Sequence, residues 1–210
     1  MNKLGDLSCN EFLTELASAA PAPGGGGGAA MAGALAAALA SMVANLTIGK
    51  EKFADREPEV KELLKQAEAE RVRILQLADD DAAVFNSFMS CYKLPKTTDE
   101  EKAARTAAIR AAAKQAATVP LNIARSSFAV LKLADRLVVS GNPGVITDGA
   151  CSGLLARAAL RCAEYNVRIN LGLTKDEAWN AQAAAELVQL LTDAEALETR
   201  LLAVTDKALQ

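Results

Sequence analysis

Apolar residues recur at every third or fourth position along most of this 210-residue chain, which is the spacing of one face of an α-helix. The clearest apolar stripe lies between residues 58 and 92 and consists of Ile74, Leu77, Val84, Phe85 and Phe88. No segment alternates apolar and polar residues for long enough to predict a β-strand. The pattern therefore predicts an all-α fold, a multi-helical bundle in which residues 1–210 form a single domain.

Capping sequences divide this pattern into separate helices. Capping boxes, in which Ser or Thr precedes Glu by three positions, are expected at Ser8, Thr98 and Thr174. The first box begins a short helix that ends before the prolines at 21 and 23, and the third begins the last helix. Pro58 suits the first turn of the long helix that reaches about residue 92.

The middle of the chain carries its own breaks. Val119-Pro120 either kinks the helix that begins near Thr98 or opens a further helix to about residue 140. The sequence Gly-Asn-Pro-Gly at 141–144 predicts a turn. Asp148 or Thr147 is then expected to cap a helix that reaches about residue 171.

A glycine run leads into an uncharged segment. Residues 21–28 read Pro-Ala-Pro followed by Gly24, Gly25, Gly26, Gly27 and Gly28, and no charged residue occurs from Leu16 to Gly49. We expect a long Ala-rich helix from near Gly28 to about Phe53. Twenty uncharged residues are long enough to span a bilayer, but Ala is a weak insertion signal, so the segment is interpreted as a buried helix and not as a membrane span.

Small residues follow one face of this expected helix, at Ala34, Ala38, Ser41 and Asn45. Such a face lets a neighbouring backbone approach closely, which indicates either the centre of a bundle or a subunit interface. The glycine run before it is either a flexible linker or a backbone surface for a ligand or a second subunit. It lacks the lysine of a phosphate-binding loop and has no strand before it, so its amides are expected to hold an anion or the flat face of a heterocycle.

Composition excludes several kinds of function. Histidine is absent, which removes His-dependent nucleophile systems and His-ligated zinc. The net charge of −3 shows no basic excess, so nucleic acid is not an expected partner. The four cysteines lack metal-binding spacing and are expected to be buried thiols in a cytoplasmic protein, and the polar N-terminus shows no secretory signal.

Asp81 is the strongest candidate for chemistry, because it falls on the apolar stripe of the 58–92 segment while Asp79 and Asp80 point elsewhere. A carboxylate there either has a raised pKa and serves as a general acid or base, or forms a structural cap or salt bridge. Lys50 either favours the C-terminal end of the preceding helix or delivers a cation to a cleft. Asn45 either binds a ligand or satisfies a carbonyl group in the core.

Taken together, several short sequences resemble the formiminotransferase-cyclodeaminase C-terminal family over about residues 8–205. They are Ala-Pro-x-Pro-Gly-Gly-Gly at 20–26, the segment from Met42 to Lys50, Asp81-x-x-x-Phe85, Leu-Pro-Lys-x-Thr at 94–98, Val-Pro-Leu at 119–121, Gly141-Asn142, Asp148, and Asn166-Val-x-Ile-Asn170. Pro143-Gly144 departs from the pair expected after Gly-Asn. Within the family, the lack of an attached transferase domain favours the stand-alone methenyltetrahydrofolate cyclohydrolases over the cyclodeaminases.

This resemblance implies an all-helical homodimer that acts on reduced folates without a cofactor or a metal. It also suggests roles for the candidate residues: Asp81 as base or electrostatic partner, Lys50 as proton donor or oxyanion stabiliser, the five glycines against the pterin or its bridge, and Asn45, Lys96 and Asp148 as further substrate contacts. The alternatives are a cyclodeaminase and a non-enzymatic helical dimerisation module.

Overall fold

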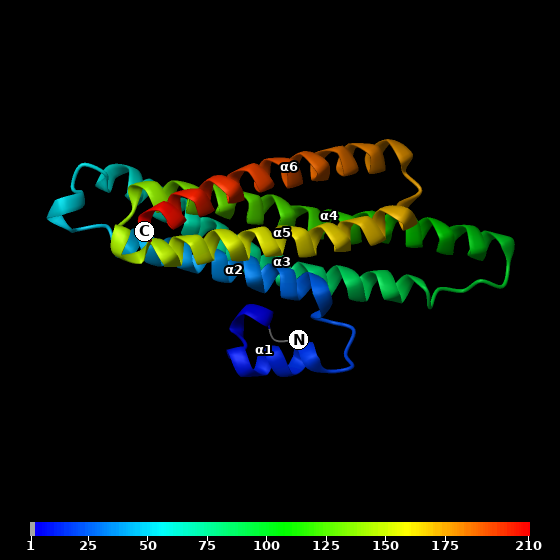
Figure 1. Cartoon of the computed structure of the whole chain (residues 1–210). Coiled ribbons are helices and arrows are strands. Elements are labelled where there is room, and N and C mark those ends of the chain that lie inside the picture. Colours follow the sequence, from blue (N-terminus) through cyan, green and yellow to red (C-terminus); the bar gives the residue numbers. More distant parts are fainter. Residues whose placement is uncertain (1–2) are drawn as a thin grey trace.

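The computed structural model describes residues 3–210, and every regular element in that part of the chain is a helix (Figure 1). The α-helices are α1 (Cys9–Ala17), α2 (Gly24–Asn45), α3 (Glu57–Cys91), α4 (Asp99–Ser140), α5 (Ile146–Thr174) and α6 (Glu177–Ala208). Short 3-10 helices occupy η1 (Leu4–Asp6), η2 (Glu51–Phe53) and η3 (Pro143–Val145). The all-α prediction is confirmed.

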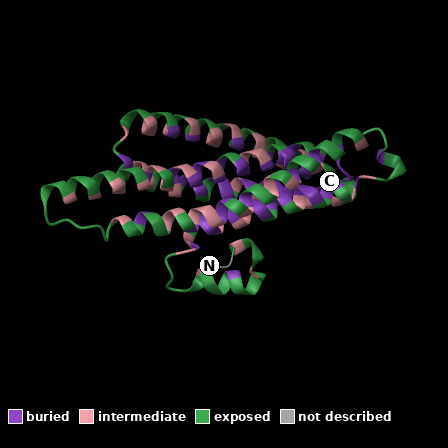
Figure 2. Ribbon diagram, turned by 180° about the vertical axis from the view of Figure 1, so that it is seen from behind, coloured by how far each residue is buried: buried purple, intermediate pink, exposed green. Residues whose placement is uncertain are grey.

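Helices α2 to α6 lie side by side in an elongated bundle, and the segment with η1 and α1 projects from its flank (Figure 1). The buried residues lie on the inward faces of the long helices (Figure 2). Small residues let α2 sit close to its neighbours: the Ser152 hydroxyl of α5 donates 2.7 Å to the Ala36 carbonyl oxygen of α2. Close packing of alanine-rich helices therefore forms most of the core.

Two of the three predicted capping boxes are confirmed. Ser8 caps α1 with Glu11, and Thr98 caps α4 with Glu101, each by reciprocal bonds between side chain and backbone. The third prediction is wrong, because Thr174 lies at the end of α5 and the Asp176 side chain caps α6 by accepting from the Trp179 amide.

The Ala-rich helix α2 begins earlier and ends earlier than predicted. Gly24, with φ of 55°, starts it, so the glycines form its first turns and not a loop before it. After Asn45 the chain turns, and the Thr47 hydroxyl accepts 2.8 Å from the Asn142 amide. A glycine run tolerates both the left-handed first residue and close contact with neighbours.

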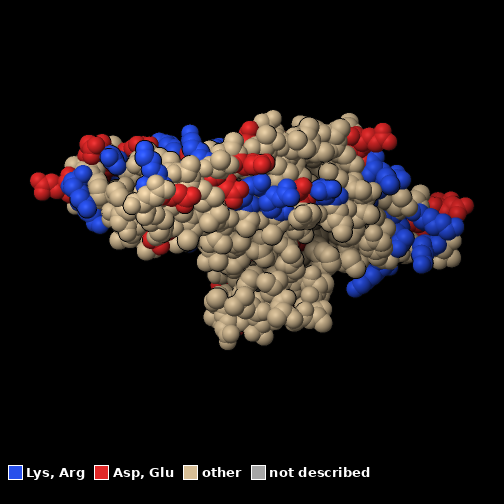
Figure 3. Space-filling view, in the orientation of Figure 1, with Lys and Arg blue, Asp and Glu red and all other residues tan. Residues whose placement is uncertain are grey.

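Helix α2 is long and apolar enough to cross a membrane by length and composition, but 61% of its most apolar stretch is buried within the protein. That burial fits the interpretation of a core helix. In Figure 3 the surface over α1 and α2 shows almost no charged side chains, while Lys, Arg, Asp and Glu gather elsewhere on the molecule.

The helix boundaries predicted in the second half of the chain are confirmed only in part. Helix α4 runs through Pro120 without interruption, so no separate helix begins there. The 141–144 turn is confirmed, and the Asn142 side chain caps η3 by accepting from the Gly144 amide. Helix α5 begins at Ile146 with no side-chain cap, so neither Thr147 nor Asp148 caps it.

The prediction of buried cysteines is wrong. Cys9, Cys151 and Cys162 are exposed and Cys91 is partly exposed, all as free thiols. Cys151 and Cys162 belong to the side of α5 that faces away from the bundle, since the core positions on this helix are taken by residues such as Ala156 and Leu160.

Candidate active site

A groove lies beside the N-terminal end of α2, between α3, α4 and α5. Its volume is about 300 Å³, near the lower limit for small-molecule sites. The residues that line it come from three helices: Asp81, Val84, Phe85 and Phe88 from α3, Ala116 and Pro120 from α4, and Asn166, Ile169, Asn170 and Leu173 from α5. The groove is therefore mostly apolar, with one carboxylate and two amides.

Asp81 is held against the first turn of α2. A Cβ atom added at Gly26 would overlap the Asp81 carboxylate, so the absence of a side chain at this glycine makes room for the acid. Gly25 lies next to Asn166, whose Nδ2 would be 3.5 Å from an added Cβ. The glycine run and Asp81, singled out separately in the sequence, thus meet at one edge of the groove.

Burial raises the pKa of Asp81 to about 6, because removal from water disfavours the charged carboxylate. No hydrogen bond or ion pair from residues 3–210 reaches this carboxylate, whereas Asp79 accepts 2.6 Å from the Leu4 amide and Asp80 accepts 2.9 Å from Gln76. The prediction of a raised pKa is confirmed, and the structural salt-bridge interpretation is not supported. A carboxyl group that titrates near neutrality suits proton transfer or the stabilisation of a cation.

The walls of the groove are suited to a flat ring. Phe88 is 8% exposed and packs edge-on against Tyr92, with ring centroids 5.3 Å apart. On the α5 side of the groove Ile169 is 71% exposed, so its apolar surface is open to a ligand. An aromatic or partly reduced heterocycle would cover these surfaces and exclude water from Asp81.

In a single chain, three other predicted site residues lie at the opposite end of the bundle from the Asp81 groove. Asn45 ends α2, Lys50 follows in the exposed turn before η2, and Asp148 lies in the first turn of α5. Since an α-helix rises 1.5 Å per residue, Asn45 is about 28 Å from Gly26 along α2. A single chain therefore does not bring Lys50, Asn45 or Asp148 to Asp81.

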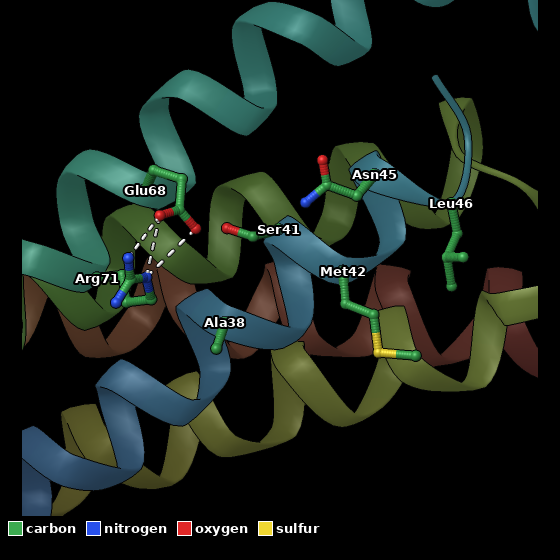
Figure 4. A pocket seen from close by; sticks show the side chains of 7 residues that line it. All are labelled: Ala38, Ser41, Met42, Asn45, Leu46, Glu68 and Arg71. Carbon is green, nitrogen blue, oxygen red and sulfur yellow. Dashed lines mark hydrogen bonds and ion pairs between the residues drawn. The ribbon is translucent and has the colours of Figure 1, made fainter. Parts of the chain in front are cut away.

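Asn45 instead borders a separate hollow of about 490 Å³ between α2 and α3 (Figure 4). The charges there are mutually paired: Arg71 Nη2 lies 2.7 Å from Glu68 Oε2, and its hydrogen bonds lower the pKa of Glu68. The Ser41 hydroxyl points toward Glu68 in Figure 4 and also helps to lower that pKa. Although this hollow is larger, it offers no unpaired acid or base, so the Asp81 groove is the better candidate.

Lys96 is exposed in the loop between α3 and α4. The two helices extend well beyond the rest of the bundle at that end (Figure 1), and the start of α4 is about 25 Å from Ala116 along the helix axis. Lys96 is not among the residues that line the groove of its own chain.

Within residues 3–210, no three His, Cys, Asp or Glu side chains cluster closely enough to hold a metal ion. The expectation that the protein needs no metal remains a prediction. The groove also contains residues to which the sequence assigned no role, namely Pro120, Asn166 and Asn170. Two asparagines spaced by four on one helix face were the available signal, but only the packing of α5 against α4 brings Asn170 within 2.9 Å of the Ala116 carbonyl oxygen.

Comparison with known proteins identifies the class. The chain matches the formiminotransferase-cyclodeaminase family over residues 8–189, and it belongs to that family. It is 44% identical over 197 residues to a methenyltetrahydrofolate cyclohydrolase of Methylorubrum extorquens, a match that covers 94% of this chain and 95% of that protein. The resemblance found in the sequence is thereby confirmed.

Two further relatives are bifunctional or cyclodeaminase proteins. Formimidoyltransferase-cyclodeaminase of Sus scrofa is 33% identical over 183 residues, which cover 87% of this chain but 34% of that longer protein. The crystal structure of formiminotetrahydrofolate cyclodeaminase from Thermotoga maritima aligns with a TM-score of 0.89 at 29% identity, covering 99% of this chain and 100% of the other.

Proposed function

We propose that this protein is a methenyltetrahydrofolate cyclohydrolase, which adds water to 5,10-methenyltetrahydrofolate to give 10-formyltetrahydrofolate. The observation that carries the proposal is the 44% identity to the Methylorubrum extorquens cyclohydrolase over nearly the full length of both chains. The groove supports it, because a single carboxylate faces mostly apolar walls there.

The chemistry of the substrate suits this inventory. The methenyl bridge is part of a delocalised amidinium cation, which is already electrophilic, so water can attack its carbon without a metal. The Asp81 carboxylate would stabilise the cation and take a proton from the attacking water. The bond from the bridge carbon to N5 then breaks, N5 receives a proton, and the formyl group stays on N10. One proton leaves to solvent for each turnover.

A cyclodeaminase is the alternative enzyme, supported by the Thermotoga maritima structure that aligns along the whole chain. Such an enzyme would close 5-formiminotetrahydrofolate to the methenyl compound with loss of ammonia. The same carboxylate would serve either reaction, because both pass through a tetrahedral carbon between N5 and N10.

Two assays separate these functions. Purified protein is mixed with 5,10-methenyltetrahydrofolate and the loss of methenyl absorbance is followed against the rate without enzyme. In parallel, ammonia release from 5-formiminotetrahydrofolate is measured. A cyclohydrolase accelerates the first reaction and not the second, whereas ammonia release as the main activity contradicts the proposal in favour of a cyclodeaminase.

We also propose that the active form is a homodimer paired through α2. This helix carries no charge, and Leu35, at its midpoint, is 54% exposed. Met42 on α2 and Leu154 and Tyr165 on the adjacent α5 are exposed as well. A second copy of the chain would cover this apolar face, which a monomer leaves in water.

A two-fold axis near Leu35 would reverse α2 in the partner. The C-terminal end of α2 in one subunit would then lie beside the N-terminal end of α2 in the other. Asn45 of the partner subunit would therefore approach Gly25. Lys50 of the partner subunit follows in the turn after α2, five residues beyond Asn45. The pairing would thus bring the two separated groups of predicted site residues together, with Lys50 as the proton donor for N5.

The remaining expectations belong to this proposal. The substrate is a reduced folate, no cofactor takes part, and neither nucleic acid nor a membrane is a partner. We place the protein in the cytoplasm, where its four free thiols would stay reduced.

A further inference from the structure

Pro120 leaves a backbone carbonyl free in the wall of the groove. In an α-helix the carbonyl of residue i−4 accepts from the amide of residue i, and proline has no amide hydrogen. The Ala116 carbonyl of α4 therefore lacks its helical donor. Such a group is costly when removed from water unless another donor reaches it.

Asn170 of α5 supplies that donor. Its Nδ2 donates 2.9 Å to the Ala116 carbonyl oxygen and 2.8 Å to the carbonyl oxygen of Asn166. Both partners only accept, so the NH₂ group must face them and both of its hydrogens are used. The orientation of the amide is thereby fixed by its contacts.

This fixed orientation leaves the Oδ1 atom of Asn170 on the other side of the amide. Asn170 lines the groove together with Asp81, and within residues 3–210 no group donates a hydrogen bond to this oxygen. Asn170, a residue of the groove lining, therefore carries a neutral acceptor that cannot turn to become a donor without losing both bonds to backbone carbonyls. A fixed acceptor without a partner selects a ligand that brings a donor.

We propose that Asn170 is a substrate-binding residue whose Oδ1 accepts a hydrogen bond from a ring N–H of the reduced pterin, and that Pro120 positions it through the free Ala116 carbonyl. The inference rests on the proposed folate activity. A pterin carries N–H groups on its ring edge, while its methenyl bridge carries none. Asn170 would thus hold the ring edge and leave the bridge for Asp81.

The test compares Asn170→Ala in two backgrounds, wild type and Pro120→Ala. In the wild-type background, loss of the amide leaves the Ala116 carbonyl unpaired and lowers the melting temperature. In the Pro120→Ala background, the new backbone amide pairs with that carbonyl, so Asn170→Ala costs less stability. The KM for 5,10-methenyltetrahydrofolate should nevertheless be about 10-fold above the wild-type value in both Asn170→Ala and the double variant, with kcat changed by less than about threefold. Pro120→Ala alone should also raise KM, because the carbonyl that positions Asn170 is then no longer free.

Asn122→Ala serves as the matched control, because Asn122 lies two residues beyond Pro120 on α4 and accepts from Arg125 outside the groove. Its KM should equal that of the wild type. An unchanged KM in Asn170→Ala overturns the inference. A wild-type KM in the double variant also overturns it, since the role of Asn170 would then be only to pair with the Ala116 carbonyl. If Asn170→Ala does not fold, the KM of the double variant, compared with that of the wild type, decides the question. A wild-type protein without folate activity overturns the proposed function itself, which separates that failure from failure of the inference.

Discussion

At the scale of single residues, the site depends on a carboxylate that the fold keeps partly out of water. Asp81 has apolar neighbours on α3 and the backbone of Gly26 beside it, and no described group compensates its charge. Its pKa of about 6 is the result. Such a group is poorly placed for stability and well placed for reaction with a cationic substrate.

Asp81→Asn should lower kcat/KM for the methenyl compound by about 100-fold or more, because the amide neither takes a proton nor offers a full negative charge. In the wild type, kcat/KM should rise with pH through an apparent pKa near 6, as the carboxyl group loses its proton. Steady-state kinetics across this range, with circular dichroism to check folding, measure both. Near-normal activity in a folded Asp81→Asn variant would exclude Asp81 as the base.

The same substitution should change stability in the opposite direction. The pKa of Asp81 is about 6 when folded, above its ordinary value of 3.8, so between these values the folded state holds a proton that the unfolded state has lost. The free energy of unfolding therefore falls as pH rises through this window, by up to about 3 kcal/mol. Asp81→Asn should be more stable than the wild type near pH 8, and the difference should shrink toward pH 4, as measured by urea unfolding. A wild type that gains stability on Asp81 ionisation would contradict this.

At the scale of elements, the sequence predicted the starts of α1 and α4 correctly but not the start of α2. Capping chemistry located the starts of α1 and α4, because these caps are local interactions within four residues. The glycine run was expected to precede a helix, since glycine is a poor helix former. The structure places it inside the helix, because Gly26 must be small beside Asp81 and Gly33 beside Ile74 and Ser127. Long-range packing overrode local propensity.

Gly26→Ala should therefore lower turnover, because the added methyl group would force the Asp81 carboxylate to move. We expect a loss of about 10-fold or more in kcat, since a small displacement of a catalytic group is costly. Gly172→Ala is the matched control: it is an exposed helical glycine of α5 with nothing within 4 Å of its added Cβ. It should keep full activity and gain up to about 1 kcal/mol of stability. Equal kinetics in the two folded variants would show that Gly26 does not position Asp81.

At the scale of the whole molecule, the question is how residues at opposite ends of α2 act together. Asp81 and Gly26 lie at one end, while Asn45 and Lys50 lie at the other. Antiparallel pairing of two α2 helices is the arrangement we propose to join them, and the exposed Leu35 at the midpoint is its suggested centre.

Subunit complementation tests this arrangement. Asp81→Asn and Lys50→Ala should each be nearly inactive alone. When they are unfolded together and refolded as an equal mixture, half of the dimers contain one of each, and one of their two sites has both residues intact. About a quarter of the wild-type activity should return. If no activity returns although light scattering confirms dimers, Lys50 does not complete the site of its partner. As a separate check of the contact, Leu35→Arg should give an inactive monomer.

The sequence alone determined the all-helical class, the family, the absence of histidine chemistry and the identity of Asp81 as the unusual carboxylate, because helical period, composition and local caps are properties of neighbouring residues. Only the tertiary structure decided that the glycines form the first turns of α2 and that Asp81 lies against Gly26. It also decided that Asn170 pairs with the carbonyl freed by Pro120 and that Lys50 lies at the opposite end of α2 from Asp81. These facts depend on the packing of helices that are distant in sequence, and no local pattern contains that information.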